Sequence, residues 1–155
     1  MPQDRDLQHL FPAFDQRISQ ILQELATYAN QHMPGVRWVM TEGFRTARYQ
    51  RELFQKGRTI PPIGRGYCVT FCDGFRKRSC HQSSLAVDIW PIQGSAIAKV
   101  APDHWVYLGH LARQHGLEWG GDWEQIVDVS HVQWPEADRS TYAIARKWQV
   151  QVGLR

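Results

Sequence analysis

The sequence has no long apolar run. No stretch of its 155 residues approaches the roughly 18 to 20 apolar residues that a membrane-spanning helix needs. Its first residues, Met1-Pro2-Gln3-Asp4-Arg5-Asp6, also lack the basic and apolar regions of a secretory signal peptide. We therefore expect a protein without a transmembrane segment or a signal peptide, which is made and kept in the cytoplasm.

Cysteine is scarce, and its number is odd. The three cysteines are Cys68, Cys72 and Cys80, which argues against a complete disulfide framework. A structural zinc cluster of these thiols with His81 is an alternative, although their spacing matches no common zinc-finger pattern. We expect reduced cysteines in a loop, and a disulfide between Cys72 and Cys80 after release from the cell stays open.

Repeats, linkers and low-complexity segments are also missing. The hydrophobic content of 43% and the seven tryptophans predict one folded domain over residues 1–155 with a substantial core. The net charge of +3 is modest. It favours contact with acidic polymers such as a bacterial wall, but it is equally typical of an ordinary soluble protein.

Apolar periodicity predicts an α+β fold, with a small and mostly antiparallel sheet backed by helices. Helices are expected over 15–32, 46–56, 103–115 and 140–149, and strands over 36–41, 85–90 and 126–134. The segment 61–79 is rich in proline, glycine and charge, so we expect a long loop that leads to a short strand near 67–71.

Two imidazoles and two carboxylates stand at short spacings. Asp88 lies within the apolar run 85–90, where a carboxylate must be paired, hydrogen-bonded or metal-bound. His81 and His131 supply nitrogen donors, and three protein ligands on zinc leave one position for water. Residues 128 and 131 do not share a face of a strand, so Asp128 is expected in the turn before His131, near that water.

These motifs resemble those of a known family. The runs Ser79-x-His81-x(6)-Asp88 and Asp128-x-x-His131 resemble the zinc peptidoglycan peptidases, which include D-alanyl-D-alanine carboxypeptidases and the L-alanyl-D-glutamate endopeptidases of phage endolysins. Two further segments are similar to the family's motifs, and together the blocks cover roughly residues 36 to 134: Gly43-Phe44-Arg45-Thr46 with the residues behind it, and Trp119-Gly120-Gly121-Asp122-Trp123.

The resemblance implies a hedgehog/D-Ala-D-Ala-peptidase-like fold with one zinc ion in a cleft. It implies that His81, Asp88 and His131 are the zinc ligands and that Asp128 is the general base, which later protonates the leaving amine. Arg45 would steady substrate oxygens with its permanently charged guanidinium. Ser84 stands where the family usually has glycine.

The implied function is hydrolysis of bacterial peptidoglycan stem peptides, most of all at the L-alanyl-D-glutamate bond. We expect a monomeric, endolysin-like bacteriolytic enzyme that reaches the cell wall through a separate pore or lysis and has no nucleic-acid partner. The alternatives are a D-alanyl-D-alanine carboxypeptidase, a non-catalytic zinc-containing wall-binding domain, and a nucleic-acid module built on the cysteine loop with its basic cluster 76–78. Trp119 and Trp123 belong either to a substrate wall or to the core.

Overall fold

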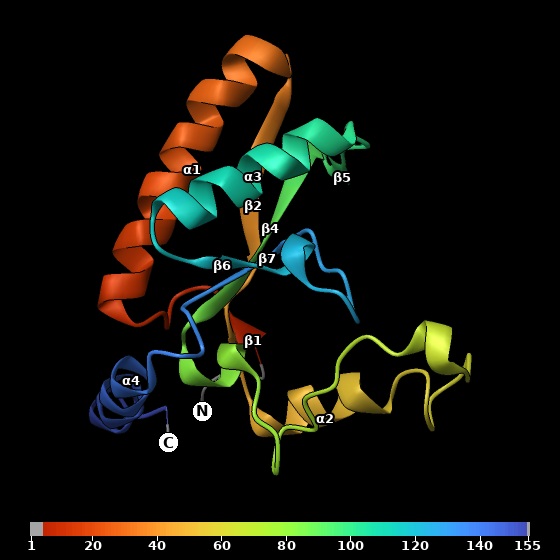
Figure 1. Cartoon of the computed structure of the whole chain (residues 1–155), viewed down its shortest axis with the longest axis vertical. Helices are drawn as coiled ribbons and strands as arrows, with labels where there is room; N and C mark the ends of the chain where they lie inside the picture. Colours follow the sequence, from red (N-terminus) through yellow and green to blue (C-terminus); the bar gives the residue numbers. More distant parts are fainter. Residues whose placement is uncertain (1–4, 155) are drawn as a thin grey trace.

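The sheet at the centre of the fold is antiparallel throughout. The computed structural model describes residues 5–154 and orders the main strands β2-β4-β7-β6, with β5 paired to β4 (Figure 1). Residues 1–4, on which part of the signal-peptide expectation rests, lie outside this range. The strands are β2 (Val36–Glu42), β4 (Ala86–Gln93), β5 (Ala96–Ile97), β6 (Glu118–Trp119) and β7 (His131–Gln133). A short pair, β1 (Arg5–Asp6) with β3 (Phe44–Arg45), lies apart.

Within residues 5–154, four α-helices accompany the sheet, which confirms the predicted α+β class. They are α1 (Pro12–His32), α2 (Ala47–Gln55), α3 (Pro102–Gln114) and α4 (Arg139–Gln151). In Figure 1, α1 and α3 lie beside the sheet, whereas α2 and the loop that follows it lie below. Within residues 5–154, no helix is long and apolar enough to cross a membrane.

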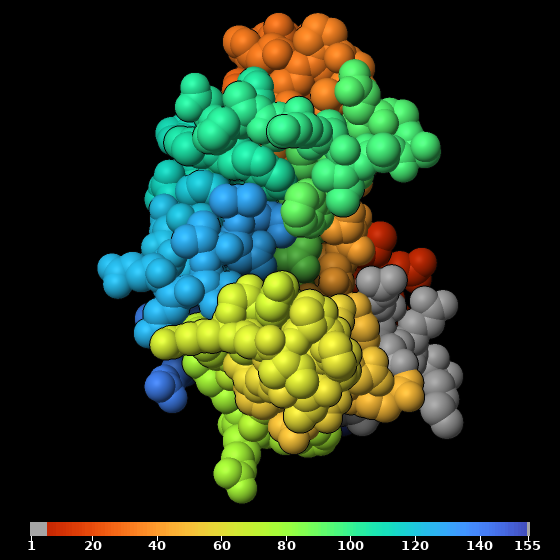
Figure 2. All heavy atoms as spheres, turned by 90° about the vertical axis from the view of Figure 1, so that its right-hand side faces the viewer, coloured from red at the N-terminus to blue at the C-terminus, as the bar shows by residue number. Residues whose placement is uncertain are grey.

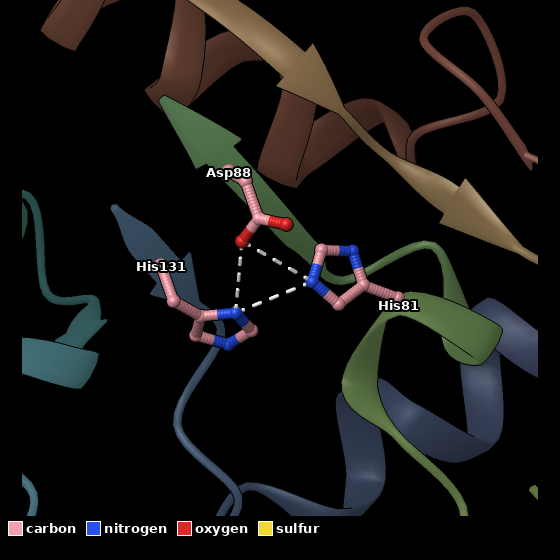
Figure 3. Close-up of side chains that lie close together, drawn as sticks. All are labelled: His81, Asp88 and His131. Atoms are coloured by element: carbon pink, nitrogen blue, oxygen red, sulfur yellow. Dashed lines mark hydrogen bonds and ion pairs between the residues drawn. The ribbon is translucent and has the colours of Figure 1, made fainter. Parts of the chain in front are cut away.

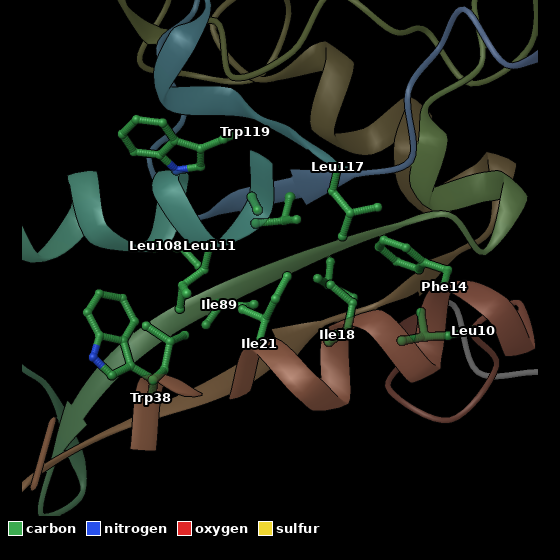
Figure 4. Packing of buried hydrophobic residues seen from close by; sticks show 14 of the residues in the cluster. Leu10, Phe14, Ile18, Ile21, Trp38, Ile89, Leu108, Leu111, Leu117 and Trp119 are labelled. Carbon is green, nitrogen blue, oxygen red and sulfur yellow. The ribbon is translucent and has the colours of Figure 1, made fainter. Parts of the chain in front are cut away.

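The hydrophobic core lies between α1, α3 and one face of the sheet. Side chains of α1 at helical spacing, among them Ile18, Ile21 and Leu25, are fully or almost fully buried. They pack with Ile89 of β4 and with Leu108 and neighbouring residues of α3 (Figure 4). Helix α1 starts three residues before the expected position because proline is favoured in the first turn of a helix.

The ends of α2 follow local chemistry that the sequence predicts. The hydroxyl of Thr46 accepts a hydrogen bond from the backbone N–H of Tyr49 at 3.2 Å, as expected for an N-cap. After the helix, Gly57 adopts a φ of +78°, a conformation that glycine reaches without strain. This helix therefore begins at Ala47, two residues beyond Arg45, at the edge of the candidate site.

The predicted strand near residues 67–71 is wrong. A short 3₁₀ helix (Arg65–Tyr67) occurs there, and an irregular segment follows it. Val69 and Phe71 have strand-forming side chains, but they are 49% and 41% exposed. Backbone carbonyls of this segment are bound by side chains rather than by a strand: Arg58 donates to the oxygen of Thr70 at 3.1 Å, and Gln50 to that of Cys72 at 2.9 Å.

Candidate metal site and cleft

His81 is held by a capped turn that precedes the central strand. It lies in a 3₁₀ helix (Cys80–Ser83) whose N-cap, Ser79, forms a reciprocal capping box with Gln82. The helix ends at Ser84, whose φ of 61° explains why glycine suits this position. His81 is 1% exposed, and its Nδ1 donates a hydrogen bond to the carbonyl oxygen of Gly43 at 2.7 Å. Its Nε2 is therefore the nitrogen that faces His131 and Asp88 and could bind a metal.

Asp88 and His131 are direct neighbours on adjacent strands. The antiparallel register of β4 and β7 pairs Asp88 with His131, so their side chains leave the sheet at the same place. The Nε2–H of His131 donates to the Oε1 of Gln133 at 2.8 Å, since a carbonyl oxygen can only accept. This bond leaves Nδ1 as the nitrogen that faces Asp88 and His81.

The three donor atoms stand at the separations that a tetrahedral ion requires. The Nε2 of His81 lies 3.2 Å from the Nδ1 of His131, and the Oδ1 of Asp88 lies 3.5 Å and 3.3 Å from these two nitrogens (Figure 3). Zinc bonds of about 2.0 to 2.1 Å in tetrahedral geometry place neighbouring ligand atoms about 3.3 to 3.4 Å apart. The residues therefore fit a zinc ion.

Burial and charge prepare this group for a cation. Burial lowers the pKa of His81. Burial alone would raise the pKa of Asp88, but the two histidines outweigh it and hold that pKa well below the usual range. The pKa of His131 is raised although burial opposes this, because Asp88 accepts its hydrogen bond. An ionised carboxylate thus lies between two imidazoles, and a divalent cation would take the place of the shared proton.

Gln133 and Glu118 fix the ring of His131 and were not predicted from the sequence. Gln133 is 3% exposed, and its amide donates to the Oε2 of Glu118 at 2.8 Å while its oxygen accepts from His131. Such partners orient metal-binding histidines in many sites. One signal was available: Gln133 lies two residues from His131, on the same face of a strand.

Asp128 occupies the turn before β7, as expected, and is separate from the three donors. Its Oδ1 accepts a hydrogen bond from the hydroxyl of Ser130 at 2.8 Å and another from the backbone N–H of Ser130 at 3.3 Å. The carbonyl oxygen of Gly120 accepts a hydrogen bond from the backbone N–H of Asp128 at 3.0 Å, and Gly120 packs closely against Asp128. These contacts hold the turn as well. Asp128 lines the same cleft as the three donors, and its charge helps to raise the pKa of His131.

Arg45 lines the cleft, but protein groups already bind each of its three nitrogens. Nε donates to Glu42 at 2.6 Å, Nη1 to Gln50 at 2.8 Å, and Nη2 to the Oδ2 of Asp88 at 3.4 Å. The residue is 8% exposed. Arg45 therefore positions the carboxylate of Asp88, a contact that the sequence did not reveal because 43 residues separate the two.

The cleft has a volume of about 700 Å³ and two walls. One wall is formed by Val69 to Cys72 with Lys77, and the other by residues 122–126. Trp123 belongs to the second wall, with its ring centroid 4.9 Å from that of His131. Trp119 is instead 7% exposed and packs in the core, where its indole N–H donates to the carbonyl of Val129 at 2.7 Å. Trp119 therefore belongs to the core, and Trp123 lines the cleft.

The thiols do not join the metal donors. Among residues 5–154, the only group of metal-ligating side chains is His81, Asp88 and His131. The three cysteines are unpaired. The Sγ of Cys80 accepts a hydrogen bond from the hydroxyl of Tyr142 at 3.1 Å, and burial raises the pKa of this thiol to about 12. Burial also raises the pKa of Cys72. The arrangement gives no support to a cysteine zinc cluster.

Comparison with known proteins identifies the class of peptidase that the chain resembles. The family model described as D-alanyl-D-alanine carboxypeptidase matches residues 73–134. The peptidoglycan L-alanyl-D-glutamate endopeptidase CwlK of Bacillus subtilis (strain 168) is 33% identical over 109 residues, which is 64% of this chain. These matches confirm the resemblance to the peptidoglycan peptidases that the sequence motifs predicted. The chain spans 61% of the length of CwlK.

Solved structures confirm the fold. The L-Ala D-Glu endopeptidase ChiX of Serratia marcescens aligns with a TM-score of 0.56 and 23% identity, covering 84% of each chain. The LD-carboxypeptidase LdcB also aligns with a TM-score of 0.56, at 14% identity, covering 86% of this chain and 70% of that one. DacB of Streptococcus pneumoniae D39 aligns with a TM-score of 0.53 and 15% identity, over 94% of this chain and 78% of DacB.

Proposed function

We propose that this chain is a zinc metallopeptidase domain that hydrolyses peptidoglycan stem peptides at the bond between L-alanine and D-glutamate. The observation that carries the proposal is the set of tetrahedral separations among His81, Asp88 and His131, with Asp128 in the same cleft. The relatedness to CwlK, an L-alanyl-D-glutamate endopeptidase, supports this choice of bond.

The residues of the cleft divide the work of such a reaction. Zinc held by the three donors would supply Lewis-acid polarisation of the scissile carbonyl and a lowered pKa for water. Asp128, fixed by Ser130, is the group that accepts a proton from the attacking water and passes it to the leaving amine. Arg45 holds Asp88 in place through its Nη2. The ring of Trp123 packs against that of His131, with the centroids 4.9 Å apart.

Digestion of purified muropeptides, with and without a chelator, tests the bond that is cut. Mass spectrometry of the products should reveal a new amino terminus at D-glutamate, and only in the metal-loaded reaction. Release of D-alanine would instead favour the carboxypeptidase alternative. That alternative has an observation of its own, since the matching family model over residues 73–134 is described as D-alanyl-D-alanine carboxypeptidase.

Substitutions separate metal binding from proton transfer. We expect His81→Ala, Asp88→Ala and His131→Ala each to lose both zinc and activity, because three ligands are the minimum for a catalytic zinc site. Asp128→Asn should keep its zinc and lose turnover by about 100-fold or more, the usual contribution of a positioned general base. An Asp128→Asn protein with natural activity would remove Asp128 from the mechanism.

We further propose that the enzyme is a monomer with one zinc per chain and lyses bacteria, as an endolysin does. Sedimentation of the zinc-loaded protein, with metal analysis of the same sample, tests the first two points. Clearing of permeabilised bacterial cells by the purified chain tests the third. Intact cells should stay turbid, since we propose that the protein reaches the wall only through a separate pore or after lysis.

A further inference from the structure

The cleft contains many carboxylates but few cations. Among the residues that the structure describes, two basic residues line it, Arg45 and Lys77. The acidic residues that line it are Glu42, Asp88, Asp122, Glu124, Asp128 and Glu136. An anionic substrate would be repelled from most of this surface, so the positions of the cations decide where such a group binds.

Of the two cations that line the cleft in the described part of the chain, Lys77 is the one that remains available. Each nitrogen of Arg45 already donates to a protein side chain, and two of the three acceptors are the carboxylates of Glu42 and Asp88. In contrast, the ammonium of Lys77 makes no ion pair or hydrogen bond with any other residue that the structure describes. A free ammonium on the wall of a cleft is suited to bind a carboxylate from outside.

A tight turn holds Lys77 at this wall. The Oδ1 of Asp73 accepts hydrogen bonds from the backbone N–H groups of Phe75, Arg76 and Lys77 at 2.9, 2.8 and 3.0 Å. The carbonyl of Lys77 accepts in turn from the N–H of Gly74 at 3.1 Å. Three consecutive backbone N–H groups are thereby bound to one carboxylate, so the backbone at Lys77 is held in one conformation.

The turn is also fastened to the rest of the fold at Gly74. This residue has a φ of +87°, and a Cβ there would lie 2.6 Å from the carbonyl oxygen of Ala47 in α2. The amide of Gln82, in the same 3₁₀ helix as His81, donates to the carbonyl of Gly74 at 2.9 Å. The turn that carries Lys77 is thus connected directly to the element that positions a metal donor.

The same wall exposes apolar side chains toward the cleft. Val69 and Phe71 line it, and Trp123 lies on the opposite wall, 36% exposed. Figure 2 shows the loop, in yellow, projecting toward the viewer below the blue segment around residue 125. Exposed apolar surface beside a cleft is typical of a binding site, and a cation at its edge selects a ligand with both an apolar body and a negative group.

We propose that Lys77, with Val69 and Phe71, forms a subsite that binds the free carboxylate of the glutamate residue in the substrate. This inference rests on the proposed function. Glutamate has two carboxyl groups and uses one to continue the peptide, so a stem peptide cut before D-glutamate presents the other as a free anion. The subsite would place that anion beside the one cation that lines the cleft, within residues 5–154, and is not paired with a protein carboxylate.

Two peptides that differ in one group test the proposal. The first contains the L-alanyl-D-glutamate bond with the free carboxylate, and the second has a carboxamide in its place. Binding is measured on zinc-loaded Asp128→Asn protein, so that hydrolysis does not interfere. We expect this protein to bind the carboxylate form about fivefold more tightly, as for a partly exposed ion pair. Adding Lys77→Met should make the two dissociation constants equal, and Lys77→Arg should restore the preference.

Arg76→Met is the matched control, because Arg76 is in the same turn but does not line the cleft. It should keep the full preference for the carboxylate form. The proposal fails if Lys77→Met keeps that preference, if Arg76→Met abolishes it, or if the two peptides bind equally from the start. Hydrolysis by the natural chain is scored separately. If the natural chain cleaves both peptides with equal KM, the peptidase function stands and the subsite is refuted. If the protein binds the carboxylate peptide selectively but cleaves neither peptide, the subsite stands and the proposed function is refuted.

Discussion

Replacing Gln133 by leucine should weaken zinc binding without changing any ligand. Gln133 is buried and is the partner of the His131 Nε2–H at 2.8 Å. Leucine has similar size but no acceptor, so the ring loses the bond that keeps its Nδ1 lone pair directed at the metal position. Loss of such an outer partner typically costs about 10- to 100-fold in metal affinity, or about 1.4 to 2.7 kcal/mol.

Competition with a chelator of known affinity measures this loss directly. The zinc dissociation constant of Gln133→Leu should rise by the stated factor, and circular dichroism should show the natural fold. Gln125→Leu is the control: it makes the same change at an exposed residue of the same cleft that does not contact His131. A dissociation constant for Gln133→Leu within about twofold of the natural value, a difference near 0.4 kcal/mol, would refute the argument.

Three further predictions concern stability. Gly109→Ala should lower the free energy of unfolding, measured in urea, by about 1 to 3 kcal/mol, because a Cβ there collides with the ring of Trp119. An unchanged free energy of unfolding would mean that the ring moves freely. Asp138 caps α4 and its pKa is lowered, most of all by the hydroxyl of Thr141, so its stabilisation is present above about pH 4 and is lost in acid. Asp138→Ala should therefore lower Tm more at pH 7 than at pH 2, and an equal loss at both would contradict this. Ser84→Ala should be less stable in urea than Ser84→Gly by about 1 kcal/mol. Both variants lose the hydroxyl, but a positive φ is strained for alanine, which has a Cβ, and not for glycine. The reverse order would show that the strain is absent.

Local rules were enough to predict several elements and one part of the site. Thr46 as an N-cap and Asp128 in a turn before His131 follow from side-chain chemistry and from the two-residue period of strands. The antiparallel α+β class follows from the order of periodic segments. These features depend on residues that are close in the sequence, so a single sequence contains the information.

Contacts between distant residues did not follow from local patterns. The β4–β7 register makes Asp88 and His131 neighbours, which was expected only from the family resemblance, and the contact of Arg45 with Asp88 across 43 residues was not predicted. The segment near Phe71 has strand-forming residues, but it has no partner strand because side chains from elsewhere bind its carbonyls. Strand propensity was therefore overridden by tertiary contacts.

The attachment of the loop over residues 61–79 has a consequence for engineering. Main-chain oxygens of this loop accept hydrogen bonds from the side chains of Gln50, Gln82 and Arg58, and every amino acid has such an oxygen. These three bonds thus do not depend on the side chains of Val69, Phe71 and Lys77, whereas Asp73 and Gly74 must stay to keep the turn. Residues such as Val69, Phe71 and Lys77 can be exchanged while the path of the chain is preserved, so this wall is a natural place to retarget the protein toward differently charged peptides.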